Sequence, residues 1–185
     1  QTSAQDFFYS PSGKTQMSVS TQQVLVKFKA GTDYATQQEI LSQYQQIAPL
    51  TKEMLPPAPK ITLVDINGLS NKSEVYRLIA QIEQHEKVVY ANHFLVHKDG
   101  TLHGVMDRIL LRLKSVDQHG AFVRAMKAST EVIYFKTNEF DPLLMELTVR
   151  GDKNALELAN EHHESGSYAF VEPDFLRIMK KLNTN

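Results

Sequence analysis

Histidine is the residue type in this 185-residue chain that most readily suggests chemistry, since seven are present and cysteine is absent. His93 and His97 lie four residues apart in a stretch that reads as a strand, and His103 follows in a turn. Three imidazoles have the donor atoms that a zinc ion needs. No H-E-x-x-H pattern accompanies them, however, and we favour surface histidines around a linker. The sequence therefore predicts no metal site.

Other candidate groups are also better explained without catalysis. His162 and His163 are adjacent on a predicted helix, where successive side chains point about 100° apart, so they form a poor chelating pair. Glu172 and Asp174 flank Pro173, and their charges suit an exposed strand edge better than acid–base work. The chain lacks a G-x-S-x-G elbow and glycine-rich phosphate loops. We therefore predict no catalytic residues and no cofactor.

The composition excludes several classes of partner. The 20 basic and 21 acidic residues leave a net charge of −1, so no strong positive field selects nucleic acid or an anionic membrane. RNA binding by a sheet would also need paired aromatic residues on the central strands, where this chain offers Phe28. No apolar run approaches the roughly 20 residues that span a bilayer, so we predict no membrane span.

The elements that must position any site repeat within the chain. The segments VLVKFK at 24–29 and ILLRLK at 109–114 share one pattern and predict the first strand of each half. In each half we then expect a helix, two strands, a second helix and a closing strand. The expected ranges are 40–47, 49–55, 60–68, 71–85 and 88–98 in the first half, and 122–126, 131–137, 143–149, 152–165 and 168–178 in the second.

Each half thus follows the order β-α-β-β-α-β, which is the ferredoxin-like pattern. We predict an α+β fold of tandem ferredoxin-like units, with antiparallel sheets, helices on one face and the strand order 4-1-3-2. The fourth strand then lies at an edge, where Pro173 is tolerated because one row of backbone groups already lacks partners. The expected divisions are an N-terminal arm or hairpin at 1–20, laid against the first sheet, a first unit at 21–98, a second unit at 105–179 and a C-terminal tail at 180–185.

A unit of this kind leaves one face of its sheet bare of helices. A bare face that mixes apolar and charged residues is typical of a docking surface for helices or for another sheet. The alternative is that the two halves pack these faces against each other or against residues 1–20. The residues expected on the bare faces are Leu25, Lys27 and Lys29 in the first half, and Leu110, Arg112, Lys114, Leu144, Glu146 and Thr148 in the second.

The two closing strands carry a resemblance to a known family. VVYANHFLV at 88–96 and YAFVEPDFL at 168–176 resemble the closing strand in the N-terminal propeptides of subtilisin-like serine proteases. The stretch at 138–176 is similar to the propeptide region of bacterial secreted subtilases, through its N-E-F-x-P-L, N-A-L-E-x-A-N and A-x-x-E-P-D segments. Only the second half keeps the E-P-D pattern, since Asn92 and His93 stand at the matching positions of the first.

This resemblance implies a secreted, periplasmic or cell-surface domain without catalysis of its own. Such propeptides inhibit the catalytic domain of a subtilisin-like protease and assist its folding, here in cis or in trans. Their open sheet face covers helices of the enzyme, and the segment after the last strand enters the substrate cleft. The docking residues that we expect are Arg112, Leu144, Glu146, Arg177, Ile178, Met179 and Leu182, with Glu146 as an anion at a helix N-terminus of the partner.

Two other classes of function remain open on the sequence alone. A free-standing protease inhibitor or protein-binding module could use the same fold. A small-molecule sensor built from paired ferredoxin-like units is a third possibility. Continuation of the reading frame into a protease domain would favour the propeptide interpretation over both.

Overall fold

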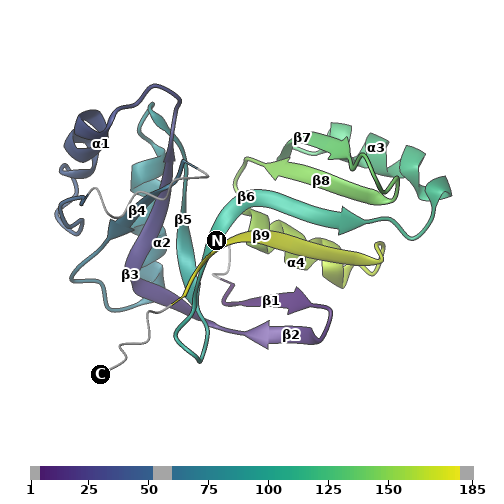
Figure 1. Cartoon of the computed structure of the whole chain (residues 1–185), viewed down its shortest axis with the longest axis horizontal. Coiled ribbons are helices and arrows are strands. Elements are labelled where there is room, and N and C mark those ends of the chain that lie inside the picture. The colour runs from purple at the N-terminus through teal and green to yellow at the C-terminus, as the bar shows by residue number, and fades with distance from the viewer. Residues whose placement is uncertain (1–4, 52–59, 180–185) are drawn as a thin grey trace. The chain divides into compact units, whose positions relative to one another are not determined.

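The computed structural model describes residues 5–51 and 60–179, and Figure 1 labels the elements. The protein is α+β, with antiparallel sheets. The helices are α1 (Tyr34–Leu41), α2 (Lys72–Glu83), α3 (His119–Ala128) and α4 (Ala155–Glu164), and the short 3-10 helix η2 (Val116–Gln118) precedes α3. The strands are β1 (Phe7–Ser10), β2 (Gly13–Gln16), β3 (Ser18–Phe28), β4 (Thr62–Asp65), β5 (Val88–Val96), β6 (Leu102–Arg112), β7 (Val132–Thr137), β8 (Leu144–Val149) and β9 (Phe170–Ile178).

The described chain divides into two compact units that interleave in sequence. One contains residues 5–17 and 105–176, and we call it the β6 unit after its central strand. The other, the β3 unit, contains residues 18–51, 60–104 and 177–179. Neither unit is therefore a single continuous stretch of the chain.

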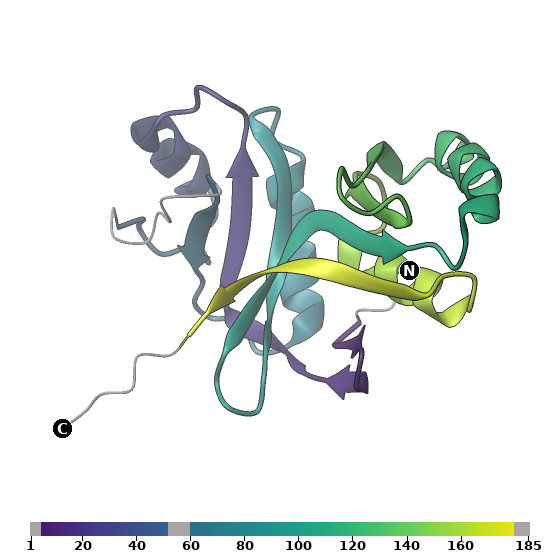
Figure 2. The same ribbon diagram turned by 45° about the vertical axis from the view of Figure 1, so that its right-hand side comes forward.

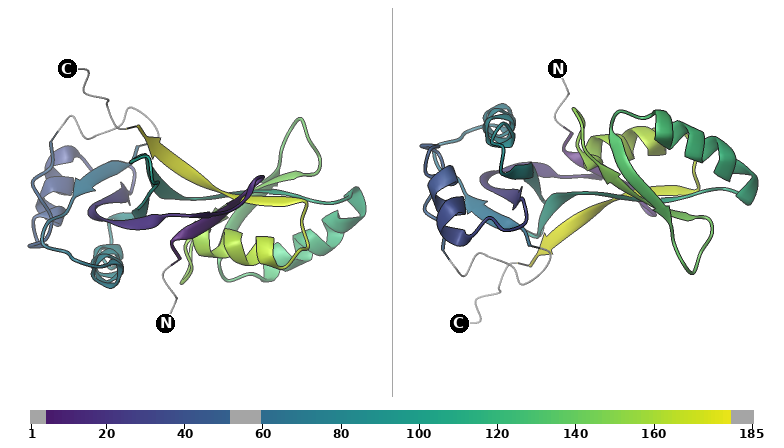
Figure 3. Two further views of the ribbon diagram at one scale, coloured as in Figure 1. Left: turned by 90° about the horizontal axis from the view of Figure 1, so that it is seen from below. Right: turned by 90° about the horizontal axis from the view of Figure 1, so that it is seen from above.

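The sheet of the β6 unit has the strand order β9-β6-β8-β7. The β6–β8 and β7–β8 ladders are antiparallel, and Leu110 on β6 lies opposite Glu146 on β8. Figure 2 shows β9 alongside β6. Both views in Figure 3 place α3 and α4 on the same side of this sheet. The helices therefore cover one face, and the other face is left without a helix of this unit.

The core of the β6 unit lies between this sheet and its two helices. Alternate residues of β6 and β8 point toward the helices, as the period of two in a strand requires. The side chain of Asn154 accepts a hydrogen bond from the backbone of Glu157, whose carboxylate reaches back to the backbone of Asn154, and this capping box fixes the start of α4. The core residues include Ile109, Leu111, Leu113, Phe122, Met126, Met145, Leu147, Ala155, Leu158 and Val171.

The N-terminal segment forms a β1–β2 hairpin that packs on α4. The Asn160 side-chain amide donates to the backbone oxygen of Phe7 at 2.9 Å, and Tyr9 Oη donates to Glu164 Oε1 at 2.9 Å. The Tyr9 ring also stacks on His163, with 4.0 Å between ring centroids. The prediction that this segment lies against the first sheet is therefore wrong. Asn160 is 1% exposed, and the hairpin backbone satisfies an amide that would otherwise be buried without a partner.

The β3 unit has the strand order β4-β3-β5, and the first residues of β6 extend it by pairing with β5. A strand was expected at 49–55, but 52–59 lie outside the described residues and 49–51 are not in a strand. An isolated bridge between Ile47 and Ile66 is found beside β4 instead. The backbone N–H of Leu50 donates to the side chain of Gln38 on α1 at 2.8 Å, so a side chain replaces the ladder partner.

The sheet face of the β3 unit that was expected to be bare is buried at its centre. Leu25 and Phe94 on this face are both 0% exposed, so the expectation that Leu25 is accessible is wrong. The β5–β6 hairpin places Gly104 opposite Phe94 and against Leu25. A Cβ atom on Gly104 would lie 2.6 Å from Leu25 Cδ2 and 2.7 Å from Phe94 Cε1. Gly104 is therefore required because these side chains approach its backbone closely.

Substitution of Gly104 by alanine tests this close approach. We expect Gly104→Ala to lower the free energy of unfolding by about 1–3 kcal/mol, because both neighbours are fully buried and cannot move aside. Gly120→Ala is the matched control, since the nearest atom to its added Cβ is Arg124 Nη1 at 3.6 Å. The control lies in α3 and should be neutral or stabilising. Equal urea midpoints for the two variants would contradict this account of the hairpin.

His93 on β5 is buried against α2 in the β3 unit. It is 1% exposed, its Nε2 lies 3.3 Å from Tyr76 Oη, and its Nδ1 has no hydrogen-bond partner within the part of the chain that the structure describes. Burial lowers the pKa of His93 from 6.5 to about 4. The imidazole is therefore neutral in the folded protein at neutral pH, and its position contradicts the expectation of a surface histidine.

This burial predicts an acid-dependent loss of stability. Below pH 6.5 the unfolded chain protonates His93 while the folded chain does not, so the free energy of unfolding should fall between pH 6.5 and 4. The full loss is about 3 kcal/mol from this residue. His93→Gln keeps a neutral polar side chain and should remove this part of the pH dependence, which urea unfolding at pH 7.5, 5.5 and 4.5 would measure. A variant with the same pH slope as the parent would show that His93 is not responsible.

Candidate functional site

The candidate site is the helix-free face of the β9-β6-β8-β7 sheet, which we call the open face. It is formed by the residues that alternate with the core positions of the same strands. Cross-strand pairing places Tyr134 opposite Thr148 and Lys136 opposite Glu146. The residues of the open face are Arg108, Leu110, Arg112, Tyr134, Lys136, Leu144, Glu146, Thr148 and Asp174.

Three ion pairs connect the charged groups on or beside this face. Arg108 Nη2 lies 3.0 Å from Asp174 Oδ2, and Lys136 Nζ lies 3.2 Å from Glu146 Oε2. The third pair joins Arg112 to Asp141 in the loop after β7. Each cation therefore has an anion beside it, and the face carries balanced charge. Such a face does not concentrate a polyanion, and it suits a partner surface that is itself mixed in polarity.

Apolar side chains lie between and beside these ion pairs. Leu110 and Leu144 are half-buried on adjacent strands, and Tyr134 is 57% exposed. Phe140 is 93% exposed in the β7–β8 loop, which in Figure 3 extends on the side of the sheet opposite the helices. Exposed aromatic residues beside a mixed sheet face are typical of protein-interaction surfaces.

Short polar side chains hold the β7–β8 loop in the conformation that exposes Phe140. Asn138 Oδ1 accepts from the backbone N–H of Phe140 at 2.9 Å, and Asp141 Oδ1 accepts from the backbone N–H of Leu143 at 3.0 Å. These are the local turns that asparagine and aspartate favour. Since Asp141 also pairs with Arg112, the loop is tied to the open face at its base.

The structure brings together three of the seven predicted docking residues. Arg112 lies directly opposite Leu144 on the open face, and Glu146 is two residues further along β8. Glu146 is bound by Lys136, and its Oε1 also accepts from Asn138 Nδ2 at 3.5 Å, so contact with a partner helix requires it to share these donors. The sequence reasoning named neither Lys136 nor Arg108, although cross-strand pairing with β8 and β9 identifies both.

The remaining predicted docking residues belong to another part of the chain. Arg177 is exposed, Ile178 is half-buried and Met179 is 77% exposed, and all three are assigned to the β3 unit. Leu182 lies outside the described residues. No contact between these residues and the three on the open face forms part of the site.

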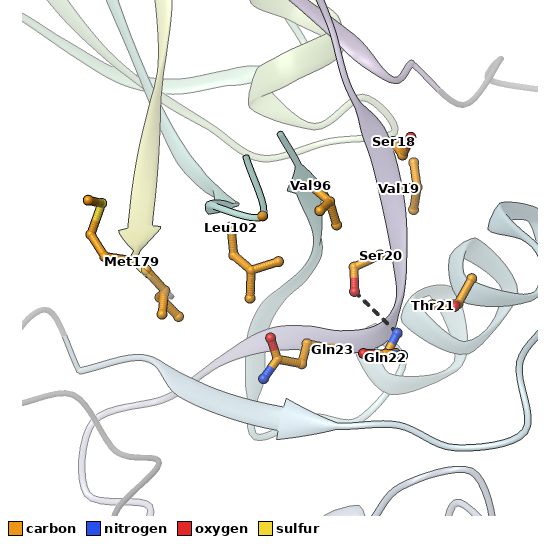
Figure 4. A pocket seen from close by; sticks show the side chains of 11 residues that line it. Ser18, Val19, Ser20, Thr21, Gln22, Gln23, Val96, Leu102 and Met179 are labelled. Atoms are coloured by element: carbon orange, nitrogen blue, oxygen red, sulfur yellow. Dashed lines mark hydrogen bonds between the residues drawn. The ribbon is translucent and has the colours of Figure 1, made fainter. Parts of the chain in front are cut away.

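Ile178 and Met179 line a pocket of about 480 Å³ in the β3 unit (Figure 4). The pairing of β3 with β5 jumps from Val19 to Val24, so residues 20–23 bulge away from the ladder. Ser20 Oγ accepts from the backbone N–H of Gln22 within this bulge at 3.2 Å. The lining contains hydroxyl, amide and aliphatic groups and no charged side chain, so it is a neutral recess without an acid–base group. The remaining lining residues are Ser18, Thr21, Gln23, Val96, Gly100 and Leu102.

The histidines of the β5–β6 hairpin are placed apart from His93. His97 Nδ1 lies 2.9 Å from Asp99 Oδ1, and the ring of His97 is 6.4 Å from that of His103. Hydrogen bonds from Thr101 and His97 lower the pKa of Asp99 to about 2. Within residues 5–51 and 60–179, no three histidine, cysteine, aspartate or glutamate side chains gather in the manner of a metal site.

Comparisons with known proteins found no matching family model, no matching curated protein and no matching solved structure. None of the helices in the described ranges has the length and apolar character needed to cross a membrane. Functional argument therefore has to rest on the geometry of the open face and on the residues themselves.

The ion pairs of the open face should contribute little to stability. We expect Glu146→Gln to change the free energy of unfolding by less than about 1 kcal/mol, because both partners are solvent-accessible. Asp107→Asn is the comparison, since Asp107 is 7% exposed and accepts from Arg150 Nη2 at 2.7 Å. That variant should lose about 2 kcal/mol or more. Equal losses in urea unfolding would mean that Glu146 supports the fold and is not available for a partner.

Proposed function

We propose that this chain is a non-catalytic domain that binds and inhibits a subtilisin-like serine protease and assists its folding. The observation that carries the proposal is the open face, a mixed apolar and charged sheet surface that the helices of its own unit leave uncovered. Two half-buried leucines, two exposed aromatic residues and three balanced ion pairs make it suitable for packing against helices.

We further propose that each unit is a ferredoxin-like unit, one per sequence repeat. The order β9-β6-β8-β7 supports this for the β6 unit, because it lists the fourth, first, third and second strands of the repeat. In the β3 unit, the order β4-β3-β5 corresponds to the third, first and fourth strands. The Ile47–Ile66 bridge lies beside β4, where such a unit has its second strand.

Binding would use the open face as a platform for partner helices. Leu110 and Leu144 would pack between the helices, and Glu146 would face the positive end of one of them. Phe140 and Tyr134 would add apolar contact area at the side of the platform, where buried aromatic residues often dominate binding energy. A preformed sheet of this kind would assist folding by holding partner helices together in a protease that folds slowly.

The C-terminal segment would make a second contact, as an extended chain in the substrate cleft. Exposure of Arg177 and Met179 at the end of β9 is consistent with this role. Such a segment binds by strand addition, in which backbone hydrogen bonds give affinity and side chains fill pockets. A secreted, periplasmic or cell-surface location follows from the same proposal. A free-standing inhibitor would use the same two contacts, so the proposal covers action in cis and in trans.

Inhibition of a purified bacterial subtilisin by the full chain tests the proposed function. We expect Glu146→Ala, Leu110→Arg and truncation after Leu176 each to raise the inhibition constant at least tenfold, which is about 1.4 kcal/mol. Glu161→Ala is the matched control, because it removes an ion-paired carboxylate from α4 instead of from the open face. The control should inhibit like the parent chain.

Circular dichroism and urea unfolding of each variant separate loss of binding from loss of fold. If the full chain does not inhibit the enzyme, or if folded open-face variants inhibit as well as the control, the proposed docking surface is wrong. If only the truncation has an effect, binding depends on the C-terminal segment and the open face serves another purpose.

A further inference from the structure

The two outer strands of the β6 unit differ in how they are protected against pairing with another strand. β9 carries Pro173 between two acidic residues, which is a usual way to discourage edge-to-edge association. β7, at the other end of the sheet, pairs only with β8 among the described residues, and its sequence is V-I-Y-F-K-T. Ile133 and Tyr134 on this strand are 56% and 57% exposed. An edge strand with apolar side chains in solvent is a template for a further strand.

The local pairing of β7 explains why Ile133 is exposed. The register with β8 shifts between Val132 and Tyr134, so Ile133 has no partner residue on β8. Val132, by contrast, is 8% exposed and belongs to the core of the unit. The shift therefore releases one large apolar side chain that the core does not use, next to an exposed tyrosine.

The segment at 131–136, E-V-I-Y-F-K, is complementary to itself when two copies run antiparallel. With Glu131 opposite Lys136 of a second copy, Val132 lies opposite Phe135 and Ile133 lies opposite Tyr134. Every apolar residue then faces an apolar residue, and both ends place a carboxylate opposite an ammonium group. Cross-strand pairs of these two kinds are the ones that stabilise antiparallel sheets.

We propose that β7 is a self-association edge, through which two copies of this chain pair antiparallel with Glu131 opposite Lys136. The two-fold symmetry of this arrangement repeats each contact twice, as in most homodimers. Lys136 already lies 3.2 Å from Glu146, and its flexible side chain can be shared between that carboxylate and Glu131 of the second copy. Six residue pairs form a small interface, so the dimer is weak and concentration-dependent.

Charge-reversal variants of the full chain test the proposal by analytical ultracentrifugation. The parent chain should shift from monomer toward dimer between about 5 and about 500 µM, the range expected for a small interface. Glu131→Lys places lysine opposite lysine in a homodimer, and Lys136→Glu places glutamate opposite glutamate. Each variant alone should therefore stay monomeric across this range, with association at least tenfold weaker than in the parent.

A mixture of the two variants supplies the decisive measurement. One Glu131→Lys chain and one Lys136→Glu chain restore both opposite-charge pairs, so the mixture should form heterodimers where neither variant self-associates. A misfolded variant could not be rescued in this way, which separates the proposal from simple loss of structure. Glu161→Lys, on α4 and away from β7, is the control and should dimerise like the parent. A parent chain that stays monomeric, dimers that persist in both single variants, or a mixture that stays monomeric would each overturn the proposal.

Discussion

Alternation of side chains along β6 is the constraint on which the core and the open face of the β6 unit both depend. Ile109 and Leu111 point toward the helices, whereas Leu110 and Arg112 point away from them. A shift of one residue in the pairing with β8 would exchange these sets, burying arginine and exposing the core. The energy of burying the aliphatic residues therefore fixes the register, and the register in turn brings Arg112, Leu144 and Glu146 to one surface. Stability and binding are in this sense specified by the same strand.

Much of the local structure could be predicted because its signals are local. The periodicity of apolar residues located all four helices approximately, and Asn154 with Glu157 marks the start of α4 through a capping box that is readable in the sequence. Pro173 correctly indicated an outer strand, since β9 pairs only with β6 among the described residues. The positions of Arg112, Leu144 and Glu146 on one face followed from the period of two in their strands.

The features that sequence reasoning missed depend on contacts between distant residues. Nothing near Leu25 indicates that Gly104 will approach it, and nothing near residue 7 indicates a contact with Asn160. His93 was assigned to the surface because its residue type is usually exposed, but its place on β5 beneath Tyr76 decides its burial. Phe140 follows the same rule in reverse, because the turns made by Asn138 and Asp141 direct it into solvent.

The bond between Asn160 and Phe7 has a consequence for the order of folding. It joins residues 153 positions apart, and the second bond of Asn160, to Gln5, spans 155. Contacts of such high sequence separation require a large loop to close before they form, so they tend to come late. On the ribosome, the N-terminal hairpin emerges first but has to wait for α4, while almost the entire β3 unit is synthesised between them. The first residues to be made are therefore among the last to reach their final positions.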